Sequence, residues 1–328
     1  MAIRKAATAD PIAPAAAAEA RELYERMLLI RRFEDTIQSL FMKGEVHGTT
    51  HLYSGQEAVA VGVSSALEEG DLVAATYRGH GHALAKGVEP GRLLDEMLGR
   101  ATGVCGGRAG SMNSVDLAHG LIGSFGIIGG SIAAATGAAL SLRRTGGVAV
   151  AYFGDGTTNQ GYFHECLNFA KVLRLPVVFV CENNLYGEFT PWEDVTAGQI
   201  RSRAEAMELW ARTIDGNDVW TVQAAAREAV AHARSGSGPA FLEALTYRFV
   251  GHSRSDPGRY RKPGELEAWR ARDPLTLAAA ALTERHGLSP EDVDAIGRAV
   301  DEQLERLVAE GLAAPFPAAD APVAEFKA

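Results

Sequence analysis

Apolar residues recur every three or four positions near the start of the chain and later give way to short, uninterrupted apolar runs. The first pattern predicts one amphipathic helix from about 19 to 43, with its apolar positions at Leu23, Met27, Ile30, Phe33, Ile37 and Leu40. The runs at 148–153, 176–182 and 240–246 predict buried strands. A shorter strand is expected at 71–75, after a buried helix at 55–67.

Helical patterns separate the predicted strands. They fall at 131–142, 162–173, 201–210 and 221–234, with a short extended segment at 212–215. Strands that alternate with helices indicate right-handed crossovers, so we predict an α/β fold whose mostly parallel sheet is flanked by helices. The last quarter turns helical, and Ser289 with Asp292 forms a capping box ahead of it.

The remaining segments are irregular. Residues 99–130 are rich in glycine and lack periodicity, which predicts a long loop of the kind that binds a ligand. Residues 1–18 are rich in alanine and proline and are expected to be disordered, and 313–328 form a second tail. The chain is therefore expected to hold one domain, 19–312, with helical extensions at both ends.

Composition narrows the possible partners and compartment. A net charge of −9 argues against a non-specific nucleic-acid binder. No apolar segment follows the first basic residues, so no secretory signal is predicted, and the run at 127–142 is too short to span a membrane. Three widely spaced cysteines indicate neither a disulfide framework nor a zinc site, which favours a reducing cytoplasm.

Two polar motifs follow predicted strands. Asp155 stands between glycines in "GDG" after the run 148–153, and "NN", Asn183 with Asn184, follows the run 176–182. Ligands of open parallel sheets gather at the carboxyl ends of strands. If these strands are neighbours, Asp155 and Asn184 share one hard cation, magnesium or calcium, which leaves coordination positions for phosphates. Taken alone, "GDG" is better explained as a simple turn after a strand, because the tripeptide is common.

The spacing of these motifs, 26 residues apart, resembles that of thiamine-diphosphate enzymes. Further motifs extend the likeness: "HLYSGQEAVAVG", "TYRGHGH", "GGRAGSM", "FGIIGG", "GDGTTNQG", "CENNLYG" and "GHSRSDPG". Across about 20–310 the chain resembles the alpha subunit of thiamine-diphosphate-dependent 2-oxo acid dehydrogenases, the first components of the pyruvate, branched-chain and acetoin dehydrogenase complexes.

The resemblance implies roles for residues of these motifs. It implies that Mg²⁺ is bound by Asp155, the Asn184 side chain and the Tyr186 carbonyl. The implied cofactor contacts are Tyr77, Arg78, Gly126, Ile128, Gly156, Thr157 and Arg248. It also implies that His51 faces the thiazolium and substrate. His252 is implied to lie on a mobile loop near the diphosphate, where it contacts the cofactor and helps to transfer the acyl group. His80 either contributes to the site or braces the loop.

The resemblance also implies the reaction and the partners. The family decarboxylates a 2-oxo acid, here pyruvate or a branched-chain acid, and passes the acyl group to lipoamide of an acyltransferase component. The activating glutamate comes from a beta subunit, which implies an alpha2-beta2 heterotetramer. Three alternatives remain: an acetoin dehydrogenase, a carboligase that joins the 2-oxo acid to an aldehyde, and a scaffold subunit that has lost its cofactor. Asn113 and Phe125 depart from the usual motifs and leave the substrate open, and nothing in the sequence decides whether Ser253 is phosphorylated.

Overall fold

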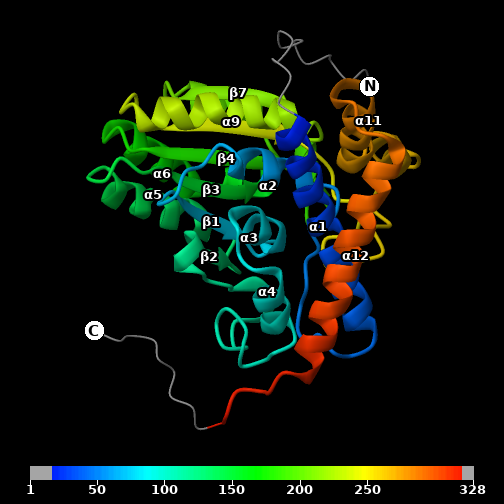
Figure 1. The fold of residues 1–328 in the computed structure, drawn as a ribbon. Coiled ribbons are helices and arrows are strands. Elements are labelled where there is room, and N and C mark those ends of the chain that lie inside the picture. Colours follow the sequence, from blue (N-terminus) through cyan, green and yellow to red (C-terminus); the bar gives the residue numbers. More distant parts are fainter. Residues whose placement is uncertain (1–16, 320–328) are drawn as a thin grey trace.

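A computed structural model describes residues 17–319 and contains one six-stranded parallel sheet. The strand order is β2 (Leu121–Phe125), β1 (Leu72–Thr76), β3 (Ala149–Gly154), β4 (Val177–Asn183), β8 (Ala240–Leu245) and β7 (Trp210–Asp215) (Figure 1). The predicted α/β class and parallel sheet are confirmed. β3 and β4 are direct neighbours, as the argument about Asp155 and Asn184 required.

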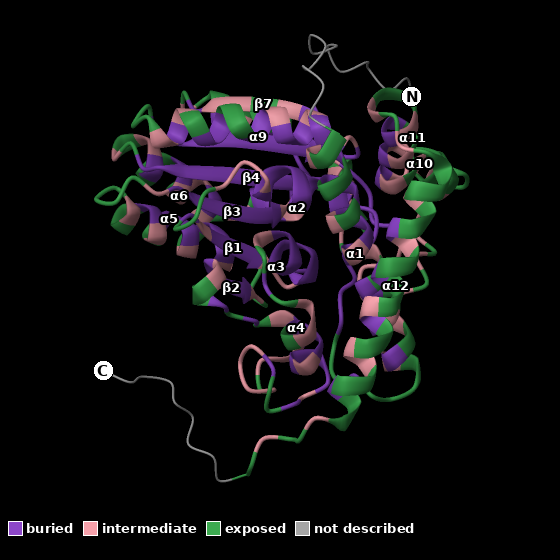
Figure 2. Ribbon diagram, in the orientation of Figure 1, coloured by how far each residue is buried: buried purple, intermediate pink, exposed green. Residues whose placement is uncertain are grey.

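Helices cover both faces of the sheet because successive strand residues alternate between two apolar cores. In β3, Val150 and Tyr152 pack into one core, and Ala149, Ala151 and Phe153 into the other. Figure 2 shows the central strands buried between these layers.

The larger core includes buried residues of α1 (Ala17–Met42), α2 (Glu57–Ser64), α3 (His80–Lys86), α4 (Pro90–Met97), α9 (Val219–Arg234), α11 (Pro274–His286) and α12 (Pro290–Ala313). The smaller core includes residues of α5 (Gly130–Leu142), α6 (Gly161–Val172) and α8 (Ile200–Glu205). α1 packs against α11 and α12, so the N-terminal helix lies beside the two C-terminal helices (Figure 1). The capping box at Ser289 and Asp292 is present at the start of α12.

Two local expectations were wrong. The long loop at 99–130 contains β2, a short edge strand whose glycine weakened the sequence signal, and two 3-10 turns at 110–112 and 117–119. The helix expected at 201–210 ends at Glu205, because Trp210 already pairs with Ala240 as the first residue of β7. The helix predicted at 162–173 is confirmed as α6, and a 3-10 turn at 155–159, which begins with Asp155, precedes it.

The predicted N-terminal tail, 1–18, lies outside the described residues except for its last two, which begin α1. At the other end, α12 continues to Ala313, and 320–328 lie outside the described part. A small antiparallel hairpin, β5 (Tyr186–Gly187) and β6 (Thr190–Pro191), follows β4, and two short helices, α7 (Trp192–Val195) and α10 (Glu265–Arg270), complete the fold. Within 17–319 no helix is long and apolar enough to cross a membrane.

Candidate active site

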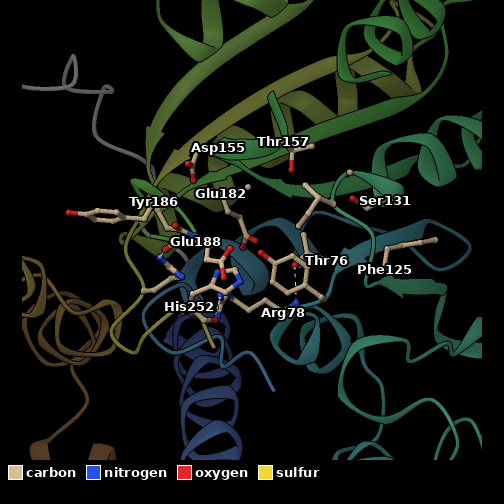
Figure 3. A pocket seen from close by; sticks show the side chains of 18 of the residues that line it. Thr76, Arg78, Phe125, Ser131, Asp155, Thr157, Glu182, Tyr186, Glu188 and His252 are labelled. Carbon is tan, nitrogen blue, oxygen red and sulfur yellow. Dashed lines mark hydrogen bonds between the residues drawn. The ribbon is translucent and has the colours of Figure 1, made fainter. Parts of the chain in front are cut away.

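A cavity of about 300 Å³ lies where the parallel strands end. Residues that line it follow β1, β2, β3, β4 and β8 along the chain, so one edge of the sheet supplies all of these segments (Figure 3). The predicted residues at its wall are Tyr77, Arg78, Ile128, Asp155, Gly156, Thr157, Asn184, Tyr186, Arg248 and His252. His51 and Gly126 are not part of this wall.

Asp155 and Asn184 each present an unpaired oxygen in a buried position. Asp155 is 1% exposed, and its Oδ2 has no hydrogen-bond partner within the described part of the chain. Asn184 donates from Nδ2 to Gln56 Oε1 over 3.0 Å, which leaves its Oδ1 without a partner among the same residues. Burial raises the pKa of Asp155 to about 6. Two orphaned hard oxygens on adjacent strands fit a magnesium ion.

Asn183, the other half of "NN", has a different environment. Its amide nitrogen donates to Glu243 Oε1 at 2.9 Å, and its amide oxygen accepts from the Leu185 N–H at 3.2 Å. These bonds satisfy the side chain within the sheet and in the turn that follows β4. Of the two asparagines, only Asn184 has an oxygen free for a ligand.

Two buried guanidinium groups face the cavity without an acidic partner. Arg78 is 4% exposed and donates to two carbonyl oxygens, those of Leu52 and His252 (2.7 Å for the second). Arg248 is 2% exposed, donates to the Glu188 carbonyl at 2.9 Å, and keeps Nη1 unpaired. No salt bridge to either arginine occurs within residues 17–319. Buried cations of this kind require an anion, and a guanidinium matches phosphate oxygens.

His51 and His252 lie together beside these arginines. Their ring centroids are 5.0 Å apart, and the His51 ring is 4.5 Å from that of Tyr77. Burial, with the nearby Arg78, lowers the pKa of His51 to about 3 and that of His252 to about 4. With pKa values this low, both rings are neutral at pH 7. They still offer N–H donors and lone pairs.

The loop that carries His252 is organised by one carboxylate. Asp256 accepts hydrogen bonds from the N–H groups of His252 and Gly258 and from the Tyr260 hydroxyl, at 2.6, 2.8 and 2.9 Å. Burial acts to raise the pKa of Asp256, but these donors outweigh it and lower that pKa. Tyr260 also lies 3.3 Å from Arg248, so the loop is joined to the arginine at the cavity wall.

The segment predicted to contact the aminopyrimidine lies at the open rim of the cavity. Gly126 is exposed, Ile128 is 39% exposed and Ile127 is 77% exposed. Gly129 follows with a φ of +77°, and a side chain there would meet the Tyr162 hydroxyl at 2.5 Å, so this turn requires glycine. An open rim with exposed isoleucines is suited to contact with another chain.

Sequence reasoning missed several residues of the site. Gln56 orients Asn184, and its place inside the motif "HLYSGQEAVAVG" was the available signal. Glu182 lines the cavity and bonds to the Tyr53 hydroxyl and to His82 Nε2 (3.1 Å), although His82 had no predicted role. His80 braces the loop, because both of its ring nitrogens are bonded to protein side chains.

Comparison with known proteins agrees with the motifs. Residues 25–320 match the family described as "Dehydrogenase E1 component". The alpha subunit of acetoin:2,6-dichlorophenolindophenol oxidoreductase from Bacillus subtilis is 43% identical over 300 residues, which covers 90% of this chain and 89% of that protein. The chloroplastic pyruvate dehydrogenase E1 component subunit alpha-3 of rice is 40% identical, covering 93% of this chain and 76% of that protein. The pyruvate dehydrogenase E1 alpha subunit of Rhizobium meliloti is 40% identical, covering 88% and 82%.

These relatives are named as alpha subunits, which implies a beta subunit as partner. The E1 family depends in general on thiamine diphosphate. The resemblance seen in the motifs is confirmed: the chain belongs to the dehydrogenase E1 component family.

Proposed function

We propose that this chain is the alpha subunit of a thiamine-diphosphate- and Mg²⁺-dependent 2-oxo acid dehydrogenase that acts on pyruvate or a branched-chain 2-oxo acid. One observation carries the proposal: two orphaned buried oxygens, on Asp155 and Asn184, line the same cavity as two buried guanidinium groups without acidic partners. A magnesium diphosphate supplies the cation that the oxygens lack and the anion that the arginines lack.

The proposed roles follow from this arrangement. Asp155, Asn184 and the Tyr186 carbonyl hold Mg²⁺, and Arg78 and Arg248 bind diphosphate oxygens. Tyr77, Gly156 and Thr157 line the diphosphate pocket, and Gly126 and Ile128 contact the aminopyrimidine from the rim. When bound, thiamine diphosphate supplies the nucleophilic carbon and the electron sink for decarboxylation. His51 and His252, neutral at pH 7, orient the substrate by hydrogen bonds, and His252 helps to transfer the acyl group.

The proposed partners complete the site. A beta subunit covers the open rim around Ile127 and Ile128 in an alpha2-beta2 heterotetramer, and supplies the glutamate that activates the aminopyrimidine. A lipoyl acyltransferase component then takes the acyl group. The site keeps its ionic side chains intact, which disfavours a scaffold subunit that has lost its cofactor.

A second candidate is an acetoin dehydrogenase, because the Bacillus subtilis relative bears that name at 43% identity. A carboligase with the same cofactor is the third. The test is to co-express the chain with its beta subunit and supply thiamine diphosphate, Mg²⁺ and one substrate at a time. Acylation of a lipoyl domain by a 2-oxo acid supports the proposal, whereas turnover of acetoin alone supports the second candidate. Consumption of an added aldehyde supports the carboligase, and failure to bind the cofactor refutes all three.

A further inference from the structure

Glu34 is a carboxylate on the apolar stripe of α1. It lies four residues after Ile30 and three before Ile37, and all three side chains are 0% exposed. Burying an ionised carboxylate is unfavourable unless hydrogen bonds or charges compensate it. Its burial therefore calls for strong partners, and those partners lead to the cavity.

Two groups bind Glu34, and each belongs to a segment of the proposed active site. The first is the N–H of Tyr53, which lies two residues after His51 and donates to Glu34 Oε1 at 3.0 Å. The second is His80, which lies two residues after Arg78. Its Nδ1 is 3.0 Å from Glu34 Oε2 and 3.2 Å from Oε1. Because a carboxylate oxygen can only accept, His80 Nδ1 carries a proton that it donates to Glu34, and His80 Nε2 lies 2.8 Å from the Ser111 hydroxyl.

The peptide group between Leu52 and Tyr53 connects Glu34 to Arg78. Its N–H end donates to the Glu34 carboxylate, and its carbonyl end accepts from Arg78 Nη1. The peptide plane is thus held at both ends, by Glu34 at its N–H and by Arg78 at its carbonyl, so a shift of the Glu34 acceptor moves the carbonyl that fixes Arg78. The other terminal nitrogen of Arg78 is fixed by the His252 carbonyl at 2.7 Å.

We infer that Glu34 is a positioning residue for the diphosphate site: through the Leu52–Tyr53 peptide and His80 it fixes the guanidinium of Arg78. Glu34 itself does not line the cavity. The inference rests on the proposed function, because it takes the anion bound by Arg78 to be the cofactor's diphosphate.

Two conservative variants separate position from charge. In Glu34→Gln the amide oxygen still accepts from the Tyr53 N–H, and the amide nitrogen donates to His80 Nδ1 once the imidazole proton moves to Nε2 and is donated to Ser111. Glu34→Asp keeps the charge, but its shorter side chain does not reach both partners. Positioning therefore predicts an effect of Glu34→Asp and none of Glu34→Gln, whereas a purely electrostatic role predicts the reverse.

The measurement is titration of the co-expressed alpha–beta complex with thiamine diphosphate in the presence of Mg²⁺. We expect Glu34→Asp to weaken binding by about fivefold or more, the loss associated with one hydrogen bond, and Glu34→Gln to stay within about twofold. Asp71→Asn is the matched control, because Asp71 is equally buried (1%) but binds the Val148 N–H and Arg234 at the opposite edge of the sheet. Its affinity should equal that of the unsubstituted complex.

A double variant tests whether the effect passes through Arg78. Added to Arg78→Met, Glu34→Asp should cause no further loss of affinity. The inference is overturned if Glu34→Asp binds as tightly as the unsubstituted complex, if Glu34→Gln is the weaker variant, or if the two losses add in full. If Glu34→Asp does not assemble, Ser111→Ala removes one hydrogen bond of the same network and should weaken binding by more than about twofold, and a smaller change would overturn the inference. An unsubstituted complex that does not bind thiamine diphosphate refutes the proposed function instead.

Discussion

Arg78 allows the proposed anion site to be tested by affinity and stability together. Burial, followed by repulsion from Arg248, lowers the pKa of Arg78 to about 10. Relative to its usual value of 12.5, that is equivalent to about 3 kcal/mol of destabilisation while the guanidinium is charged, which it is at pH 7. Because the folded pKa is the lower one, this penalty is present throughout the physiological pH range.

Arg78→Met removes this penalty together with the two hydrogen bonds to the Leu52 and His252 carbonyls. Those bonds contribute about 3 kcal/mol in total, so the gain and the loss nearly cancel. We expect the thermal midpoint of the cofactor-free complex to stay within about 4 °C of the unsubstituted value. Affinity should respond differently, because bound diphosphate compensates the charge: a loss of about 3 kcal/mol is about 100-fold in Kd.

Arg31 is the matched control. It is also largely buried, but it pairs with Glu57 and Asp273, and the same desolvation is outweighed by these carboxylates, which raise its pKa. Arg31→Met leaves two carboxylates without their cation and should cost about 3–5 kcal/mol of stability. Isothermal titration with thiamine diphosphate and Mg²⁺, beside thermal unfolding of the cofactor-free complexes, gives both readouts. If Arg78→Met binds within about threefold of the unsubstituted complex, Arg78 is not a diphosphate ligand.

Three further predictions follow from the site. Asp155→Ala should assemble with the beta subunit but lose its cofactor on gel filtration, and retention equal to the unsubstituted complex would refute the metal assignment. The chain without its beta subunit should show no decarboxylation, and measurable turnover by the purified single chain would contradict the partner argument. The pKa values of about 3 and 4 for His51 and His252 lie below the unfolded value of 6.5, so the unfolded state binds more protons and stability falls as pH drops from 6.5 towards 4. Urea unfolding should therefore show a smaller loss between pH 7 and pH 5 when both histidines are changed to glutamine, and equal losses would refute the shifted values.

The strand ends were predictable because local chemistry marks them. An apolar run that stops at glycine and a carboxylate, as at Asp155, marks the end of a buried strand, and its pairing with Asn184 after the next strand adds the indication of a ligand. β2 was missed because it is a short edge strand interrupted by Gly123, so its pattern was no stronger than that of the surrounding loop. The loop itself is held by a long-range contact, the buried Glu96 carboxylate, which accepts four backbone N–H groups between 105 and 110.

Glu34 shows a different limit. The sequence already places Glu34 between Ile30 and Ile37 on the apolar face of the helix. A helix prediction that considers only the apolar positions does not register a charged residue among them. Its partners could not be predicted, because the Tyr53 N–H and His80 are brought to it only by the packing of α1 against α2 and α3. The motif around His80 left two roles open, and the contacts with Glu34 and Ser111 favour bracing.

Arg31 and Arg78 show why residue identity alone does not locate an anion site. Arg78 is buried and Arg31 is largely so, but Arg31 is paired with two carboxylates whereas Arg78 donates only to backbone carbonyls. Only the folded structure distinguishes an arginine paired within the protein from one that is available to bind an anionic ligand. An unpaired buried cation lowers the free energy of unfolding of the cofactor-free protein. Ligand binding raises that free energy by RT ln(1 + [L]/Kd). The complex should therefore be most resistant to unfolding when its cofactor is bound, and Arg78→Met should remove most of that ligand-dependent gain while leaving the cofactor-free midpoint nearly unchanged.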